Sequence, residues 1–211
     1  MKNIKFGFTL SELLITVGII GTMLLILTPV LRNAIPNQPL VMFKKAYFIT
    51  ERTISELVND DGLYPENFDN AAKDFLANTV EVKYNGKTFS GSSKFCGLFA
   101  EKLNLKTIVS CSSAVTFTNG TASAGNFKTS DNIVYSMPIT DFASATDAYE
   151  IHIDTNDSKA PNCFYNASSC IAPDRFKIKV YQNGRVAVDG VREIQYLGAT
   201  NTSKRAEEFD D

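Results

Sequence analysis

The sequence is poor in the residues from which catalytic and metal sites are commonly built. It has 211 residues but a single histidine, His152, and four cysteines, none of them in a Cys-x-x-Cys unit. This composition argues against a zinc site. There is no glycine-rich phosphate loop, and no histidine beyond His152 that could activate a serine or cysteine nucleophile. We therefore predict that the protein is not an enzyme.

The chain also lacks an excess of positive charge. Its 21 Lys and Arg residues face 23 Asp and Glu residues, for a formal net charge of −2. A nucleic-acid surface that depends on bulk positive charge is therefore not expected, and no nucleic-acid partner is evident. The length leaves room for one membrane anchor and one globular domain of ordinary size.

A long apolar run does occur, at residues 8–31, and it carries one formal charge, Glu12. As an α-helix the run would be about 36 Å long, enough to cross a hydrocarbon core of about 30 Å. Lys2 and Lys5 precede it. The positive-inside rule therefore places the N-terminus in the cytoplasm and the bulk of the chain outside.

Two ordinary explanations of this run leave something unexplained. A secretory signal peptide has a shorter apolar region, of about 7–15 residues, and then a small-x-small cleavage site, which does not follow residue 31. A plain membrane anchor fits the length. However, a carboxylate in a lipid-facing helix is unfavourable, so Glu12 is expected to have a partner.

Residues 7–21 read GFTLSELLITVGIIG, which resembles the N-terminus of type IV prepilins and type II secretion pseudopilins. The shared pattern is a short basic leader ending in Gly, then Phe-Thr-Leu, one residue, Glu and an apolar helix. The resemblance implies that a prepilin peptidase cuts between Gly7 and Phe8 and methylates the new amino group of Phe8. It also implies that Glu12 is an assembly residue, paired with the N-terminal ammonium of an adjacent subunit.

The chain beyond the apolar run predicts an α+β fold. Pro36 and Pro39 predict a break or kink in the helix. Residues 40–59 then show helical periodicity, with an apolar face that should lie on a sheet. That face consists of Phe43, Tyr47, Ile54, Leu57 and Val58, with Ala46 and Thr50 between them.

Short β-like runs follow, and two of them are hairpins. Asn85-Gly86 joins residues 79–84 to 87–89 in a type I′ turn, and Asn183-Gly184 joins residues 176–181 to 186–188. The stretch GTASAGN between the predicted strands is expected to be a loop. Further strands are predicted at residues 108–109, 115–117, 133–139 and 149–153. These runs predict an antiparallel sheet in a pilin-like head.

The predicted organisation has five parts. They are a leader peptide (1–7), a transmembrane and filament-assembly helix (8–31), a proline-containing kink (32–39), an extracytoplasmic head (40–204) and a charged tail (205–211).

All four cysteines lie after the predicted anchor, in an oxidising compartment if the orientation is as predicted. We therefore expect two disulfides in the head. Three connectivities are open, and the simplest pairs nearest neighbours, Cys96 with Cys111 and Cys163 with Cys170.

Residues 151–188 carry a second, weaker resemblance, to an Asp-x-Asn…Pro-Asn…Asp-x-Phe pattern of pilin-like heads that forms a calcium-binding loop in some members. It implies calcium ligation by Asp154, Asn156 and Asp174, with Asp157 nearby, and such oxygen ligands suit calcium. Asp157 stands where the family often has glycine. The alternative is an Asx-rich turn that caps its own backbone.

The sequence thus predicts a structural subunit, a pilin or pseudopilin of a type IV pilus or type II secretion filament. The partners implied by the resemblance are the prepilin peptidase, other pilin or pseudopilin subunits and an inner-membrane assembly platform. Two alternatives stay open. One is a minor tip pilin acting as an adhesin or DNA-binding module. The other is a plain single-pass membrane protein with an extracytoplasmic domain, in the periplasm or at the cell surface.

Overall fold

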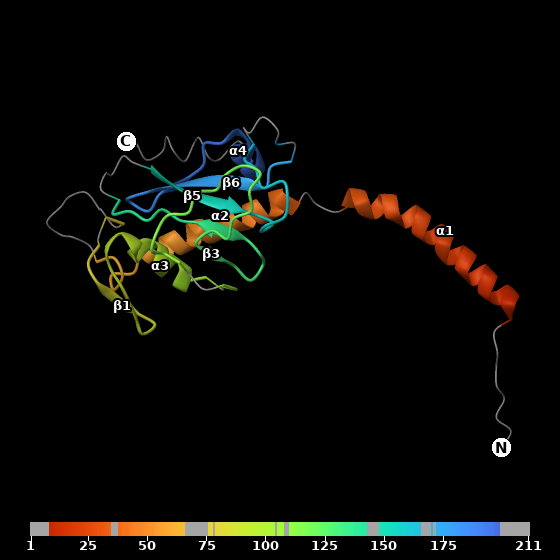
Figure 1. Ribbon diagram of the computed structural model, residues 1–211, viewed down its shortest axis with the longest axis horizontal. Coiled ribbons are helices and arrows are strands. Elements are labelled where there is room, and N and C mark those ends of the chain that lie inside the picture. The colour runs from red at the N-terminus through yellow and green to blue at the C-terminus, as the bar shows by residue number, and fades with distance from the viewer. Residues whose placement is uncertain are drawn as a thin grey trace, which may run out of the picture. The chain divides into compact units, whose positions relative to one another are not determined.

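A computed structural model gives the fold (Figure 1). It describes residues 9–34, 38–65, 76–77, 79–103, 105–107, 110–142, 148–165, 170 and 172–198, with the backbone alone for residues 26–34. The chain divides into two compact units, Met1–Gln38 and Pro39–Asp211. The predicted leader and charged tail lie outside the described residues.

The main described element of the first unit is the helix α1, which spans Leu10–Ala34 and has 25 residues. The predicted transmembrane segment, residues 8–31, extends at both ends beyond the side chains that the structure describes. Within the described residues, no helix combines the length and the apolar character needed to cross a membrane.

The second helix, α2, spans Gln38–Val58 and begins close to a proline. Pro39 lies in its first turn, where the missing backbone donor is tolerated because that N–H has no partner within the helix. α1 ends at Ala34. The predicted kink at Pro36 falls on residues 35–37, outside the described residues.

The apolar face predicted for residues 40–59 is largely confirmed. The buried residues of α2 recur at helical spacing: Phe43, Ala46, Tyr47, Thr50, Thr53, Ile54 and Leu57. Val58 is half-buried rather than buried, and Phe48 projects outward with 59% of its surface exposed. This face packs on a sheet, as predicted, since the Phe43 and Phe176 rings are 4.6 Å apart.

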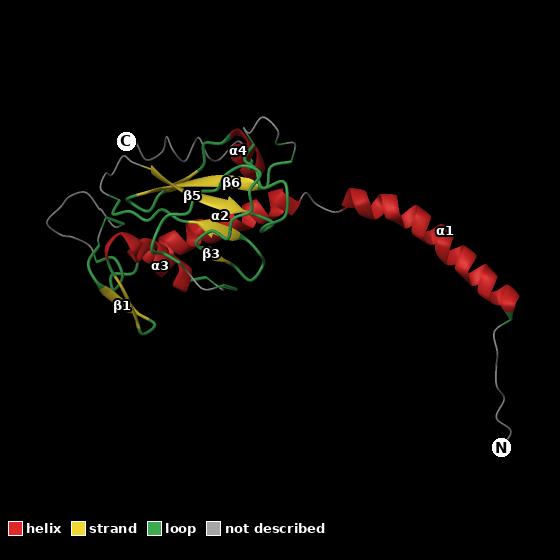
Figure 2. Cartoon of the chain, viewed as in Figure 1, coloured by secondary structure: helices red, strands yellow, loops and turns green. Residues whose placement is uncertain are grey.

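The sheet has five strands in the order β3-β4-β5-β6-β7, and every neighbouring pair is antiparallel (Figure 2). The strands are β3 (Phe127–Lys128), β4 (Val134–Ser136), β5 (Ala148–Asp154), β6 (Arg175–Tyr181) and β7 (Val186–Ala187). The central pair, β5 and β6, is the longest, and its register aligns His152 with Lys177 and Asp154 with Arg175.

Alternation along β5 and β6 gives the sheet two different faces. Ile151 and Ile153 of β5 belong to the core cluster that includes the buried face of α2, as do Phe176 and Ile178 of β6. The intervening residues of both strands are charged or polar, so the opposite face carries a row of ionisable side chains.

A separate hairpin is formed by β1 (Val82–Tyr84) and β2 (Lys87–Phe89). Its turn residues Asn85 and Gly86 have φ angles of 49° and 74°, the left-handed values that a type I′ turn requires. The predicted hairpin is therefore confirmed, with a shorter first strand.

One predicted strand is wrong, and three elements were not predicted. Residues 115–117 are not a strand; β4 already pairs with β3 and β5, which leaves it no free edge. The carbonyl of Val115 instead accepts a hydrogen bond from the Ser136 hydroxyl. Two helices, α3 (Lys94–Glu101) and α4 (Val191–Leu197), and the short β3 were not predicted. The predicted strand at 108–109 lies outside the described residues.

Candidate functional site

The N-terminus of α1 is closed by a reciprocal pair of side chains, Thr9 and Glu12. The Thr9 carbonyl accepts the first helical bond, from Leu13 N–H, so Thr9 is the N-cap residue. The Thr9 amide and hydroxyl each donate to Glu12 Oε2 at 2.8 Å, and the Glu12 amide donates to Thr9 Oγ1 at 3.3 Å. This is a capping box, in which a Thr and a Glu three residues apart satisfy each other's backbone donors.

The capping box corrects one premise drawn from the sequence. Glu12 was expected to need a cationic partner, yet the helix itself supplies a hydrogen-bonding role for its carboxylate. The macrodipole of α1 also favours an anion in its first turn. A cationic partner from another subunit is thus not required to explain a glutamate at this position, although the box leaves its charge uncompensated.

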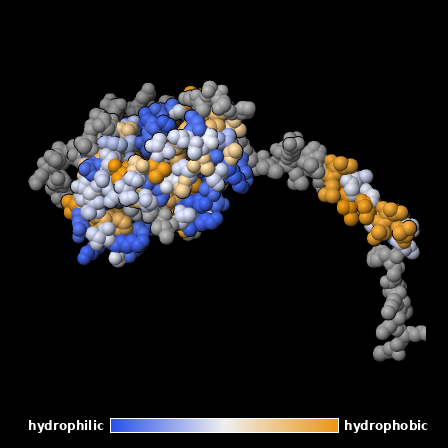
Figure 3. Space-filling view, viewed as in Figure 1, coloured by the Kyte–Doolittle hydropathy of each residue, from blue (hydrophilic) through white to orange (hydrophobic). Residues whose placement is uncertain are grey.

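Apart from this end, the described side chains of α1 are predominantly apolar and exposed. Figure 3 shows this surface as mostly hydrophobic. Leu10 is 78% exposed and Leu25 76%, and large apolar side chains on all sides of the helix between them are at least half exposed. Within the described side chains this helix therefore leaves an apolar surface exposed, a feature that calls for a covering partner or an apolar environment.

The predicted processing residues, Gly7 and Phe8, lie outside the described residues. Processing at this position stays a prediction from the motif.

Two disulfides are present in the second unit. Cys96 of α3 is joined to Cys111, and Cys163 is joined to Cys170. Of the three connectivities left open by the sequence, this is the one that pairs nearest neighbours. Each bridge closes a short loop, across 15 and 7 positions respectively.

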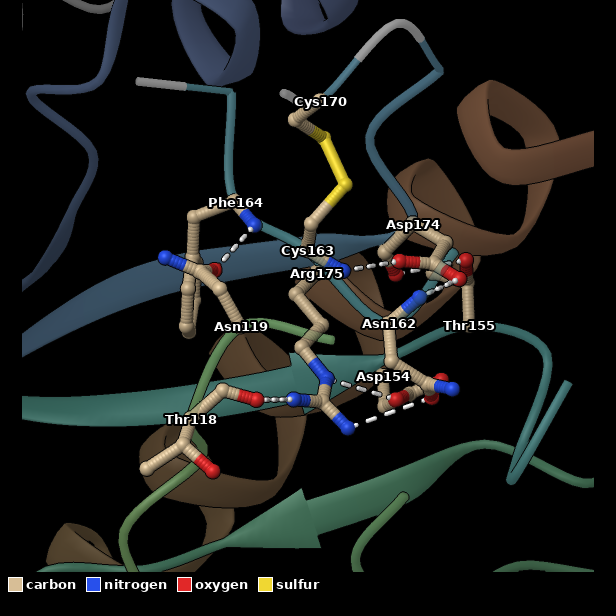
Figure 4. Close-up of a disulfide and its surroundings, with 10 residues drawn as sticks. All are labelled: Thr118, Asn119, Asp154, Thr155, Asn162, Cys163, Phe164, Cys170, Asp174 and Arg175. Atoms are coloured by element: carbon tan, nitrogen blue, oxygen red, sulfur yellow. Dashed lines mark hydrogen bonds and ion pairs between the residues drawn. A yellow bond between two sulfur atoms is a disulfide. The ribbon is translucent and has the colours of Figure 1, made fainter. Parts of the chain in front are cut away.

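Arg175 is fully buried, and its backbone lies next to Cys163 of the second disulfide while its guanidinium reaches away from the bridge (Figure 4). Arg175 Nε donates to Asp154 Oδ2 at 2.8 Å. Its other nitrogens donate to the carbonyls of Thr118 and Thr121, at 2.6 and 2.7 Å, and to Asn162 Oδ1 at 3.2 Å. One side chain thus connects the end of β5, the loop at 118–121 and the segment that leads into the disulfide.

Further contacts complete this cluster. The Arg175 guanidinium carbon lies 4.7 Å above the centre of the Phe117 ring, which shields it from water. The carboxylate of Asp174, which is also buried, accepts hydrogen bonds from two backbone amides. Asn162 N–H donates to Oδ2 at 2.9 Å, and Cys163 N–H donates to Oδ1 at 2.8 Å. Burial raises the pKa of the Asp154 carboxyl above its ordinary value, and the hydrogen bond from Arg175 opposes that rise.

The proposed calcium ligands are therefore brought to one end of the sheet, but the carboxylates have protein partners. Asp154 faces Arg175, a permanent cation, and Asp174 holds two backbone amides. The Asn156 amide donates to Asp154 Oδ1 at 3.2 Å, the local bond of an Asx turn. Among the described residues, no group of three or more His, Cys, Asp or Glu side chains could hold a metal ion. The geometry favours the Asx-turn interpretation over calcium.

His152 lies on the same charged face of the sheet. It is two residues before Asp154 on β5 and pairs with Lys177 of β6. Its Nε2 is 2.9 Å from Glu150 Oε2, and Lys177 Nζ donates to the same oxygen at 2.7 Å. The rings of Phe117 and Phe164 flank it, with centroids 6.2 and 5.3 Å away. Burial lowers the pKa of the imidazole, and the hydrogen bond to Glu150 opposes this shift.

Thr9, Arg175 and Phe117 were not among the residues predicted from sequence. The signal for Thr9 was present, as the Thr-x-x-Glu spacing before an apolar run. For Arg175 no local signal exists, because it is one of three charged residues in an ordinary alternating strand and its burial depends on segments far away in the chain.

Protein-family models, characterised proteins and solved structures were compared with this chain, and none matched.

Proposed function

We propose that the protein is a pilin-like structural subunit, a pilin or pseudopilin, that assembles through its N-terminal helix. The observation that carries the proposal is the pairing of an exposed apolar helix, α1, with one carboxylate, Glu12, in its first turn. The motif at residues 7–12 supports it, as do an α+β domain with an amphipathic helix on an antiparallel sheet and two disulfides.

The mechanism follows from the chemistry of cleavage. A cut after Gly7 would remove Lys2 and Lys5 and leave an ammonium on Phe8, close to the start of the apolar helix. Within one chain that group lies about 6 Å along the axis from residue 12, four residues at about 1.5 Å each. A neighbouring subunit, shifted along the filament, is the better partner because a straight helix directs its terminus away from its own side chains.

The energetics favour such a pairing between subunits. An ammonium and a carboxylate attract strongly in an apolar medium, whereas either charge alone has a large desolvation penalty there. The pair therefore fixes the axial position of each subunit. Before assembly the chain would be inserted in the membrane, with its N-terminus in the cytoplasm and its head outside. Its partners would be prepilin peptidase, an assembly platform and other subunits.

Because Glu12 also caps its helix, the test must separate capping from charge. Glu12→Gln keeps an acceptor for the Thr9 donors and removes the charge, whereas Glu12→Leu removes both. Each variant is expressed beside the wild type, and the amounts in membrane and sheared-filament fractions are compared. We expect both variants to insert into the membrane and to be cut after Gly7, and both to be depleted from filaments.

The two variants also identify the ways in which the proposal can fail. If the Glu12→Gln protein enters filaments as well as the wild type while Glu12→Leu does not, capping alone explains Glu12. If both enter equally, Glu12 is not an assembly residue.

A further inference from the structure

Several different segments, rather than one continuous strand, pair with the outer edge of β6, which is the side away from β5. The Arg175 amide donates to the Cys163 carbonyl at 3.2 Å, and the Tyr181 amide donates to the Arg185 carbonyl at 2.9 Å. Lys179 pairs with Ala187 of β7. β7 has two residues, so it covers only part of this edge.

The remaining outward amide, that of Lys177, is met by a side chain instead of a strand. It donates to Glu193 Oε1 at 3.1 Å, and Glu193 lies in the first turn of α4, which runs beside β6 (Figure 1). Glu193 is 6% exposed, which is unusual for a glutamate. A buried carboxylate thus occupies the place where the carbonyl of another strand would bind.

The position of this carboxylate is built into the backbone beside it. Gly190 precedes α4, and a Cβ atom added there would lie 2.0 Å from Glu193 Oε2 and 2.5 Å from its carboxyl carbon. A side chain at residue 190 would therefore displace the Glu193 carboxylate from its present position beside β6. α4 is held in place separately, because its Tyr196 ring packs 5.6 Å from Phe176 and 6.4 Å from Phe43.

An unpaired strand edge is a template for pairing with another chain, and charged side chains or covering helices are known means of blocking it. We propose that Glu193 and α4 guard the outer edge of β6 against pairing with the same edge of a second copy of this chain. The association that they oppose is an antiparallel pairing of β6 with β6 about a two-fold axis near Lys177, which would also have to displace β7 and the segment at Cys163. Such protection matters for a chain that is concentrated among its own copies.

Hydrogen exchange of the full-length protein in detergent, followed by mass spectrometry of the peptide that contains β6, tests the proposal. Glu193→Leu removes the acceptor. Gly190→Ala leaves the carboxylate chemically unchanged but displaces it, and so also serves if Glu193→Leu fails to fold. At low protein concentration we expect exchange of the Lys177 amide to be about tenfold faster in both variants. At high concentration dimers should form, and sedimentation should detect them. The Lys177 amide should then become protected from exchange again.

Two controls define the specificity. Glu193→Gln retains an oxygen that can accept from the Lys177 amide and should exchange and sediment like the wild type. Gln195→Ala changes an exposed residue of the same helix and should also have no effect. Fast exchange in Glu193→Leu and Gly190→Ala with no return of protection at high concentration would overturn the proposal. Wild-type exchange in both variants would overturn it as well.

Discussion

At the scale of single residues, His152 is a group whose ionisation the fold opposes, because burial lowers the pKa of its imidazole. Its Nδ1 is buried and has no hydrogen-bond partner among the described side chains, so a second ring proton would be an unsatisfied donor. Lys177 and Arg175 of β6 also face it and disfavour a positive charge, while Glu150 alone favours one. The folded state therefore binds a proton here less readily than the unfolded state.

The sign of the pH dependence follows from this lowered pKa. Above the ordinary value of 6.5 the imidazole is neutral in both states. Below it, the unfolded chain binds the proton first, so the free energy of unfolding should fall with decreasing pH until the folded protein is protonated too. Urea unfolding between pH 7.5 and 5 measures this, and His152→Gln should remove part of the slope. A titration of the single histidine by NMR at or above 6.5 would contradict the prediction.

Arg175 supports a second prediction at this scale. Arg175→Met leaves Asp154 buried without its partner, which costs about 3–5 kcal/mol of stability. The double variant Arg175→Met/Asp154→Leu removes both charges and should be less destabilised than the single variant, because no buried charge is left unpaired. Denaturant unfolding of the three proteins gives the comparison. Equal stability of Arg175→Met and the wild type would mean that the guanidinium does not hold this end of the sheet together.

At the scale of elements, long periodic segments and the short hairpin marked by Asn85-Gly86 could be predicted, whereas short elements without such a signal could not. The α2 face and the β5–β6 pair have enough alternating or helical repeats to be recognised from sequence. α3 and α4 have eight and seven residues and β3 has two, so packing rather than local pattern decides their form. The Arg175 cluster was equally inaccessible, since it joins segments more than 50 positions apart.

The two disulfides lead to a prediction about loops. In the chain-entropy model the Cys96–Cys111 bridge, with a separation of 15, stabilises the head by about 3 kcal/mol, and the Cys163–Cys170 bridge, with a separation of 7, by less. Replacing each pair by serine and measuring unfolding tests the order. Alkylation without reductant of protein from its native source should label no cysteine. Four free thiols there would contradict both the pairing and the orientation.

The turn at residues 154–157 yields a prediction about metal removal. Because Asp154 binds Arg175 and an amide, and Asp174 binds two further amides, calcium would have to displace existing hydrogen bonds. The melting temperature should therefore be the same in calcium and in chelator. An increase in calcium that Asp174→Asn abolishes would restore the calcium interpretation.

At the scale of the whole molecule, the two units differ in what they need. The second unit has its own buried core of aromatic and aliphatic side chains, so it carries the means of its own stability. The first exposes the apolar side chains that the structure describes, and in the proposed function lipid or other copies of the helix would cover them. A chain built in this way suits a subunit that moves from membrane to filament, which is the central claim of the proposed function.

The mass of the N-terminal peptide of protein purified from its native source tests that claim most directly. Cleavage between Gly7 and Phe8 makes the Phe8 amino group available to Glu12, and without it the proposed assembly has no cation. We predict a mature chain that begins at Phe8 and carries one N-methyl group. A peptide that retains Met1, or a chain that begins after Leu31, would contradict the account.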